Sequence, residues 1–298
     1  MSSAGRTTAI TGATGALGRR VVERLAGTDG LRLRLVVRDA SRAPDAPGAE
    51  VAENPGGYAD GAGLAAALEG VHTLYLVSAA EAADRLDQHY AAVDAAAAAG
   101  VQRIVYTSFL RARPDSTFTL GRQHALTEER IRATGVPATV LRHGFYADFV
   151  PFFATPRDGR AVIAAPAGEG RASFVSRDDL ADVAAAVLRD GSGRFDGQAL
   201  EVTGPEALTL AEAAAVLTEV TGLPAEYRPE TVEEAWASRR PSGHPDWEIE
   251  GWVTSYLAIA AGELAHVSDV VPALTGHPAL TVAEHLRRHP GDWAHLRA

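Results

Sequence analysis

A glycine-punctuated turn near the start of the chain constrains the fold more than any other feature of the sequence. The segment Thr8–Gly18 reads TAITGATGALG, so a short apolar run leads into glycines spaced three residues apart. A helical apolar stripe begins within the turn, and a second apolar run, Leu31–Val37, follows that helix. This order of strand, glycine turn, helix and strand predicts a parallel βαβ unit that binds a dinucleotide.

Each glycine of the turn has a separate expected role. Gly12 permits the tight turn, Gly15 removes the side chain where a phosphate must approach, and Gly18 allows the helix to pack closely on the strand. The N-terminus of the helix then presents unpaired N–H groups and a partial positive charge to the anion. The residues expected to bind the pyrophosphate are Gly12, Ala13, Thr14, Gly15, Ala16, Leu17 and Gly18.

Composition narrows the class of protein. The chain has 298 residues, of which 46% are hydrophobic, enough for one large α/β domain or for a nucleotide-binding core with a smaller lobe. The absence of cysteine excludes disulfides, thiolate nucleophiles and thiolate metal sites. A net charge of −10 disfavours direct nucleic-acid binding. No apolar run reaches membrane-span length and no signal-peptide core is present, so we expect a cytoplasmic protein that does not enter membranes.

Strand and helix patterns alternate through the first half of the chain. Helices are expected at 64–68, 85–99 and 120–134, and strands at 71–78, 102–108 and 138–141. This alternation predicts a Rossmann-type, doubly wound parallel sheet, in which ligands bind beyond the carboxyl ends of the strands. Residues just past those ends are therefore expected to bind the cofactor: Arg38, Ser78, Thr107, Ser108, His143, Gly144 and Phe145.

The pattern changes after residue 150. Residues 151–172 are rich in proline, glycine and small side chains, which suggests an excursion over the sheet edge, whereas 173–204 reads as a helix and a strand that rejoin the core. Three T-x-x-E capping boxes then mark helix starts, at Thr209, Thr231 and Thr281. We expect residues 1–150 with 173–204 to form the nucleotide-binding core, and 205–298 with 151–172 to form a smaller, mostly helical lobe that covers the substrate.

Seven segments spread over nearly the whole chain form a recognisable set: TGATGALG at 11–18, VVRD at 36–39, IVYTS at 104–108, HALTEE at 124–129, TGVPATVLRHGFYADF at 134–149, VTGPEALT at 202–209 and LAIAAGELAHVSD at 257–269. Together they resemble the NmrA-like branch of the atypical short-chain dehydrogenases, which includes bacterial NAD(P)H:quinone oxidoreductases and triphenylmethane-dye reductases. The resemblance implies a Rossmann fold, a nicotinamide cofactor and a reductase activity.

The tip of the second strand bears on the choice of cofactor. Arg38 follows that strand, where the adenosine ribose lies in such folds, and its guanidinium can pair with a 2′-phosphate. Arg42 adds a second positive charge nearby, whereas Asp39 could reach the same ribose. We expect NADP(H) to be favoured over NAD(H), the alternative being that Arg38 is only a solvated loop charge.

The catalytic pattern departs from that of ordinary short-chain dehydrogenases, which carry a Tyr-x-x-x-Lys pair. Leu120 and His124 stand at the corresponding positions. Without that acid, we expect hydride transfer to a strongly electrophilic conjugated acceptor such as a quinone, dye or enone. His124 and Tyr146 are candidate proton donors, and His124 is also a candidate cofactor-binding residue that contacts the nicotinamide ribose. The alternative for each is a wall of the pocket. Phe109, Tyr146 and Phe149 are the candidate substrate surface, with core packing as the alternative.

Other readings of the sequence remain open. A non-catalytic NADP(H)-sensing regulator of the NmrA-like type and a tailoring reductase or isomerase of a biosynthetic pathway both fit the same motifs. His285 and His289 have metal-ligand spacing but no third ligand nearby in sequence, so no metal site is predicted. The expected partner is a small-molecule acceptor. The sequence allows a homodimer, although no pattern isolates an interface.

Overall fold

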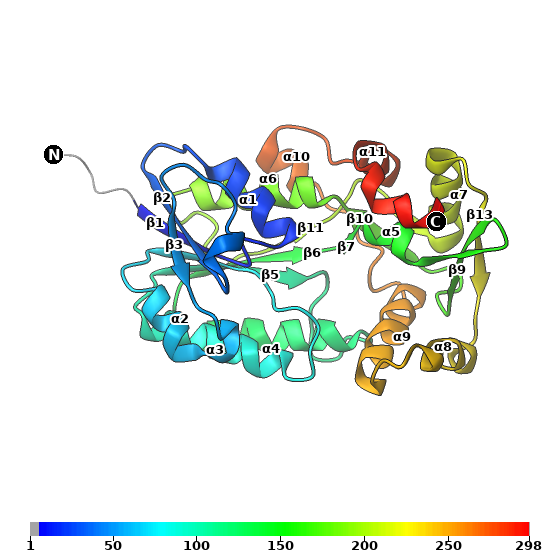
Figure 1. Ribbon diagram of the computed structural model, residues 1–298, viewed down its shortest axis with the longest axis horizontal. Helices are drawn as coiled ribbons and strands as arrows, with labels where there is room; N and C mark the ends of the chain where they lie inside the picture. The colour runs from blue at the N-terminus through cyan, green and yellow to red at the C-terminus, as the bar shows by residue number, and fades with distance from the viewer. Residues whose placement is uncertain (1–5, 298) are drawn as a thin grey trace. The chain divides into compact units, whose positions relative to one another are not determined.

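The computed structural model describes residues 6–297, which form two compact units (Figure 1). The first unit contains the residues up to Ser108, His124–Arg142 and Leu180–Leu200. The second contains Phe109–Gln123, His143–Asp179 and the chain from Glu201 onward. Among the described residues, no helix is both long enough and apolar enough to cross a membrane.

A seven-stranded sheet with the order β11-β6-β5-β4-β1-β2-β3 is the centre of the first unit. The bounds are β1 Arg6–Thr11, β2 Leu31–Val37, β3 Glu50–Glu53, β4 Thr73–Leu76, β5 Arg103–Phe109, β6 Ala138–His143 and β11 Ala199–Val202. Strand β1 pairs in parallel with both β2 and β4, and the pairs β2–β3 and β4–β5 are parallel too. The predicted Rossmann-type, doubly wound sheet is therefore confirmed.

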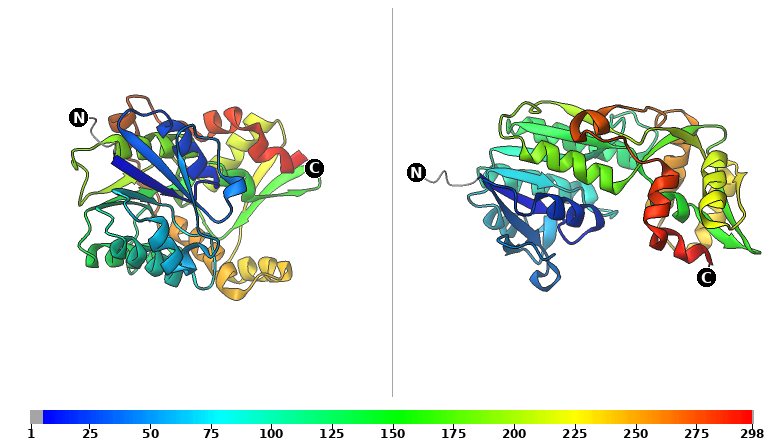
Figure 2. Two further views of the ribbon diagram at one scale, coloured as in Figure 1. Left: turned by 60° about the vertical axis from the view of Figure 1, so that its left-hand side comes forward. Right: turned by 90° about the horizontal axis from the view of Figure 1, so that it is seen from above.

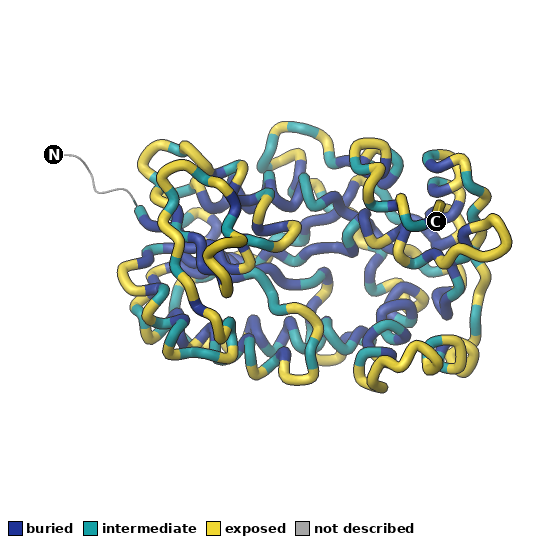
Figure 3. The backbone as a smooth tube through the Cα atoms, in the orientation of Figure 1, coloured by how far each residue is buried: buried dark blue, intermediate teal, exposed yellow. Residues whose placement is uncertain are grey.

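Helices cover both faces of this sheet. They are α1 Ala16–Leu25, α2 Gly61–Ala67, α3 Arg85–Ala98, α4 Thr119–Ala133 and α6 Arg177–Arg189. Helices α2, α3 and α4 lie on one face and α1 and α6 on the other, an arrangement that Figure 2 shows from two more sides. The central strands β1, β4 and β5 are almost fully buried (Figure 3), as apolar runs covered on both faces must be, whereas the edge strand β3 is mostly exposed.

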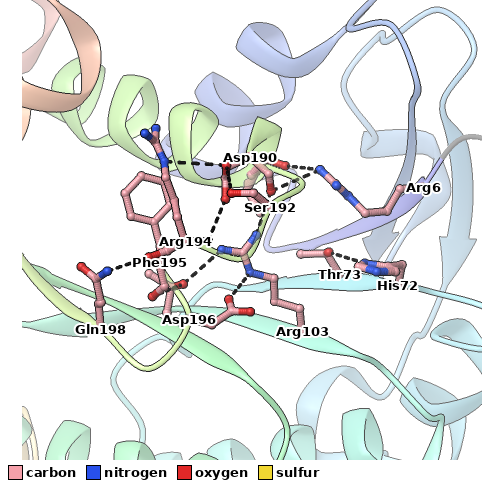
Figure 4. A network of polar contacts seen from close by, with 12 residues as sticks. Arg6, His72, Thr73, Arg103, Asp190, Ser192, Arg194, Phe195, Asp196 and Gln198 are labelled. Atoms are coloured by element: carbon pink, nitrogen blue, oxygen red, sulfur yellow. Dashed lines mark hydrogen bonds and ion pairs between the residues drawn. The ribbon is translucent and has the colours of Figure 1, made fainter.

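The amino-terminal ends of the strands are tied to the loop between α6 and β11 by arginines (Figure 4). Arg103, the first residue of β5, is buried, forms an ion pair with Asp196 at 2.7 Å and donates to the Asp190 carbonyl at 2.9 Å. Arg6, the first residue of β1, donates to the Leu188 carbonyl at 3.0 Å. Ligands of such sheets bind at the opposite, carboxyl ends, so this network supports the fold rather than a site.

The second unit contains two small sheets and most of the remaining helices. One sheet has the order β12-β10-β7 and the other β13-β9-β8. The strands are β7 Phe145–Tyr146, β8 Ala154–Arg157, β9 Arg160–Ala165, β10 Arg171–Val175, β12 Ala207–Thr209 and β13 Ala225–Pro229. The helices are α5 Phe149–Phe152, α7 Leu210–Thr221, α8 Val232–Arg239, α9 Asp246–Ala260, α10 Val270–Thr275 and α11 Val282–Arg288. Short 3₁₀ helices are η3 Arg240–Ser242 and η4 Pro290–Arg297 in this unit, and η1 Ala40–Arg42 and η2 Gly57–Ala59 in the first unit.

The sequence predicted the helix starts of this unit correctly but missed two of its strands. All three capping boxes are present, with reciprocal side-chain and backbone hydrogen bonds at Thr209, Thr231 and Thr281. The segment expected as an excursion over the sheet edge instead contains β8 and β9, which form an antiparallel pair. Its proline and glycine content concealed these strands, because Pro156 occupies β8 at the edge of its sheet, where proline is tolerated.

Candidate functional site

The turn between β1 and α1 has the close packing that its glycines imply. Gly12 has a positive φ of 62°, and the Gly15 N–H donates to the Gly12 carbonyl at 2.9 Å. A Cβ on Gly18 would lie 2.2 Å from the same carbonyl oxygen, and the nearest atoms around it belong to the backbone. Helix α1 can therefore approach the turn this closely only with glycine at position 18.

The start of α1 fits a bound pyrophosphate. Gly15 caps the helix without a side-chain hydrogen bond, and no acidic residue lies in the first turn. Gly12, Gly15 and Ala16 are exposed at the surface. An N-terminus with exposed, uncapped donors and no nearby carboxylate suits an anion.

Thr11 fixes the end of β1, where the turn begins. Its hydroxyl accepts from the Val77 N–H at 3.0 Å and donates to the Tyr75 carbonyl at 3.0 Å, which joins β1 to the end of β4. The Tyr58 hydroxyl lies 2.6 Å from the Thr11 hydroxyl oxygen and 2.5 Å from the Val77 carbonyl oxygen. Burial raises the pKa of Tyr58, so its phenol stays protonated as a donor. Sequence reasoning missed Tyr58, since no motif marks it.

Arg38 and Asp39, the two charged residues that follow β2, have different surroundings in the structure. The Asp39 carboxylate accepts from the Ser41 N–H at 2.9 Å and from the Ser41 hydroxyl at 2.6 Å, and these bonds lower the pKa of Asp39. Arg38 is exposed beside Gly57 and has no hydrogen bond or ion pair with any residue in 6–297. Asp39 is thus engaged in its own turn, while the Arg38 guanidinium is available to an anion.

His124 lies in a buried polar cluster in the first unit. Its Nε2 atom lies 3.0 Å from the Arg85 guanidinium and its Nδ1 atom 2.8 Å from the Tyr106 hydroxyl. Because a guanidinium only donates, Nε2 accepts, and the hydrogen of the neutral ring lies on Nδ1 and is donated to Tyr106. Both ring nitrogens are therefore engaged inside the protein.

The same cluster holds the chain just after β4. The Ala79 N–H donates to His89 Nε2 at 2.9 Å, and Arg85 Nε donates to the Ala79 carbonyl at 2.9 Å. Burial, with a smaller contribution from the Arg85 charge, lowers the pKa of His89 to about 3, so its ring is neutral. Sequence reasoning missed Arg85, His89 and Tyr106. The available signal was spacing: Arg85 and His89 are four residues apart, in line with the buried stripe of α3.

The hydroxyl groups at the end of β5 are also satisfied within the first unit. The Thr107 hydroxyl accepts from the Ser78 N–H at 2.7 Å, which links the ends of β4 and β5. Ser108 donates to Glu128 at 2.6 Å, and Glu128 forms an ion pair with Arg142. These contacts fix the two strand ends side by side, which is the arrangement that a ligand-binding edge requires.

The other predicted residues lie in the second unit. His143 is 1% exposed, and its Nδ1 atom lies 3.3 Å from the Tyr146 hydroxyl. Gly144 is required by close packing, because a Cβ there would lie 2.7 Å from the Ser173 carbonyl oxygen. Phe145 is buried in the aromatic core, whereas Phe149 is 37% exposed.

Phe109 and the remaining aromatic side chains of this unit mostly pack against one another. The Phe109 ring lies 5.0 Å from that of Phe118 and 5.4 Å from that of Phe145. Phe109 is only partly buried, so one part of it stays accessible. The three residues predicted to form the substrate surface, Phe109, Tyr146 and Phe149, are thus all at least partly exposed in this unit.

The histidines at metal-ligand spacing make hydrogen bonds within the second unit. His285 contacts Ser176 at 2.9 Å and Asp292 at 3.1 Å, and His289 contacts Asp178 at 2.6 Å. These contacts connect α11 to the start of α6.

Comparison with known proteins settles the family. The model of the NmrA-like family matches residues 5–238, more than half of the chain. The chain belongs to the NmrA-like family. This confirms the resemblance read from the sequence.

The relatives of this NmrA-like chain include several reductases. Quinone oxidoreductase 2 of Escherichia coli is 33% identical over 93% of this chain and 96% of its own length. The NAD(P)H azoreductase of Xenophilus azovorans is 31% identical over 94% of this chain and 96% of its own. Among solved structures, the E. coli NADPH-dependent quinone oxidoreductase complexed with NADPH has a TM-score of 0.82 at 32% identity, covering 94% of this chain and 99% of that one. The Citrobacter triphenylmethane reductase has a TM-score of 0.80 at 29% identity, covering 98% and 100%.

Proposed function

We propose that this NmrA-like protein is an NAD(P)H-dependent oxidoreductase that reduces small conjugated acceptors such as quinones or dyes. The observation that carries the proposal is the glycine turn with its uncapped helix start, in a chain whose relatives over nine-tenths of its length are named reductases. The reduced nicotinamide supplies a hydride when it is bound. The protein supplies binding, orientation and the exclusion of water.

Different residues of the first unit bind different parts of the cofactor. The turn at 12–18 binds the pyrophosphate through backbone N–H groups and the dipole of α1. Ser78, Thr107 and Ser108, fixed at the ends of β4 and β5, border the nicotinamide end. His124 holds Arg85 and Tyr106 in place, which supports the reading of His124 as a buried histidine beside the cofactor rather than as the proton donor. His143, Gly144 and Phe145, which lie in the second unit, remain predicted cofactor-binding residues.

We further propose a preference for NADP(H), based on the exposed arginine that follows β2. Arg38 is unpaired within residues 6–297, and Asp39 is held by Ser41, so a 2′-phosphate meets a cation rather than a carboxylate at this strand end. A charge-assisted hydrogen bond contributes about 1.5–3 kcal/mol, which corresponds to roughly 10- to 100-fold in affinity.

The cofactor preference is tested by measuring NADPH and NADH dissociation constants for Arg38→Ala. NADPH affinity should fall roughly 10-fold or more and NADH affinity should change little. Arg32→Ala removes an exposed arginine within β2, the strand that precedes Arg38, and should alter neither constant. Equal losses for both cofactors in Arg38→Ala would refute the assignment.

The activity is tested by following NADPH oxidation with a panel of quinones, cationic dyes and enones. Turnover of at least one class supports the reductase. Tight binding of NADPH without turnover of any acceptor would overturn it and favour a nucleotide-sensing regulator, for which binding changes only the population of conformations.

A further inference from the structure

Tyr146 of the second unit lies against a cation. The Arg177 guanidinium lies over the Tyr146 ring, 4.4 Å from its centroid, and 5.2 Å from the centroid of Phe149. Arg177 also forms an ion pair with Asp148, and the side chains of Arg177 and Asp148 are 15% and 12% exposed. A shielded positive charge over a phenol ring stabilises the phenolate relative to the phenol.

The oxygen of Tyr146 has a hydrogen-bond partner that remains neutral. His143 Nδ1 lies 3.3 Å from the Tyr146 hydroxyl, and burial, aided by the Arg177 charge, lowers the pKa of His143 to about 3. In the tautomer with hydrogen on Nδ1, His143 donates to the Tyr146 oxygen and can stabilise the phenolate in the same way. His143 Nε2 has no hydrogen-bond partner among the described residues.

Tyr146 also has an exposed aromatic neighbour, Phe149. The rings of Tyr146 and Phe149 lie 5.3 Å apart and are inclined by 31°. Tyr146 is partly exposed and Phe149 is 37% exposed, so a planar molecule could contact both rings. Tyr146 follows β6 by three residues, at the carboxyl end where sheets of this kind bind ligands.

We propose that Tyr146 is the proton donor to the acceptor and that Arg177 is its positioning cation, a tyrosine–arginine pair in place of the missing Tyr-x-x-x-Lys pair. The inference rests on the proposed reductase function and specifies its substrates. In this step the Tyr146 O–H bond breaks, and its proton forms an O–H bond with the carbonyl oxygen of the acceptor. That acceptor has gained two electrons and a hydrogen on carbon from the reduced nicotinamide. The phenolate that remains is stabilised by Arg177 and His143 until it takes a proton from water.

This step defines a substrate class. Reduction of an enone or a quinone places negative charge on oxygen, so a proton donor accelerates it. Reduction of a cationic triphenylmethane dye neutralises a carbocation and requires no proton. Acceptors that contain a conjugated carbonyl should therefore depend on Tyr146, and cationic dyes should not.

The chain provides a matched control for the pair. Arg130 lies 5.5 Å from the centroid of Tyr90 and is bonded to Asp94 at 2.8 Å, so the same three residue types meet on the first unit. The side chains of Arg130 and Asp94 are 44% and 48% exposed, and solvent screens their charges. Tyr90→Phe and Arg130→Gln therefore remove equivalent groups with no proposed role.

The first test measures the ionisation of the phenol, with no cofactor or acceptor present. NMR titration of protein labelled at the tyrosine ring carbon, with the resonance assigned by its loss in Tyr146→Phe, gives the pKa of Tyr146. Arg177→Gln should raise this pKa and Asp148→Asn should lower it, because each variant removes one of the two opposite charges. Opposite shifts cannot come from a general loosening of the fold. Absence of both shifts would overturn the role of Arg177.

The second test compares acceptors. Tyr146→Phe should lower kcat/KM about 100-fold for an enone and leave a cationic dye within a factor of about 3, as expected for a lost general acid. Arg177→Gln should lower the enone value about 10-fold, Arg177→Lys should restore part of it, and the Tyr90 and Arg130 variants should match wild type. Equal losses for enone and dye would overturn the proton-donor role alone. Failure of the wild type to reduce any acceptor would overturn the proposed function, and this step with it.

Discussion

Replacing Gly18 with alanine should damage both the stability and the cofactor binding of the first unit. The added Cβ would lie 2.2 Å from the Gly12 carbonyl oxygen and 2.7 Å from its carbonyl carbon, and neither backbone atom can rotate away as a side chain could. Such overpacking costs about 3 kcal/mol, and displacing the carbonyl also weakens its hydrogen bond from Gly15, which contributes about 1 kcal/mol. Alanine in a helix recovers about 1 kcal/mol. The net loss is about 3 kcal/mol, or roughly 6–12 °C in Tm.

Gly15→Ala separates the packing role from the phosphate role. The φ of Gly15 is −79°, which alanine adopts freely, and its Cβ would lie 3.2 Å from the Gly12 carbonyl oxygen, a contact that a small shift relieves. Stability should therefore stay within about 1 kcal/mol of wild type, while NADPH affinity falls roughly 10- to 100-fold because the methyl group occupies the phosphate position. The assay is urea or thermal unfolding beside isothermal titration with NADPH. Wild-type stability in Gly18→Ala would refute the packing argument, and wild-type affinity in Gly15→Ala would refute the phosphate cradle.

Two further predictions concern stability away from the turn. Burial lowers the pKa of His89 and His143 to about 3 and that of His285 to about 4, so the unfolded chain binds protons below pH 6.5 that the folded chain does not. The free energy of unfolding should therefore fall from pH 6.5 to pH 4 by up to about 1.4 kcal/mol per pH unit for each histidine. Urea unfolding of His89→Gln at several pH values should show a weaker dependence of this free energy on pH, equivalent to about one proton fewer taken up on unfolding. Arg103→Met should destabilise the protein by about 2 kcal/mol by removing its ion pair and carbonyl contact, and Asp196→Asn by less than about 1 kcal/mol because Asp196 is 31% exposed. Equal urea midpoints for these two variants, or loss of NADPH affinity in either, would contradict a purely structural role for the network.

Local chemistry explains what the sequence predicted well. The glycine turn is specified by three residues within seven positions, and each capping box by two residues three positions apart, so a short window contains the whole signal. Strand β2 has the expected bounds, because its run ends at the charged residue Arg38. The predictions that failed or were missed depend on contacts between distant segments. Strand β8 pairs with β9, and β9 pairs on its other side with β13, which composition alone does not indicate.

The buried cluster around His124 in the first unit also depends on contacts between distant segments, which the local sequence does not indicate. The sequence placed His124 where a short-chain dehydrogenase has lysine, and its near-neutral intrinsic pKa suggested a proton donor. The structure gives both ring nitrogens partners on other elements, Arg85 of α3 and Tyr106 of β5. A histidine whose only lone pair accepts from a guanidinium cannot take up a proton without losing that bond and approaching a cation. These partners lie 39 and 18 positions away in the sequence, so no short pattern around His124 indicates them.

The position of the cation distinguishes this NmrA-like chain from the dehydrogenases that use lysine. In the Tyr-x-x-x-Lys arrangement, one helix supplies both groups, so a sequence pattern suffices to find them. Here Tyr146 belongs to β7 and Arg177 begins α6, and the parallel pairing of β7 with β10 brings them together. The register pairs Tyr146 with Val175, two residues before Arg177, so the backbone of the small sheet determines the approach of the guanidinium to the ring. A change that weakens the β7–β10 pairing should therefore act on the reduction of carbonyl acceptors as strongly as a change in Arg177 itself, while the reduction of cationic dyes continues.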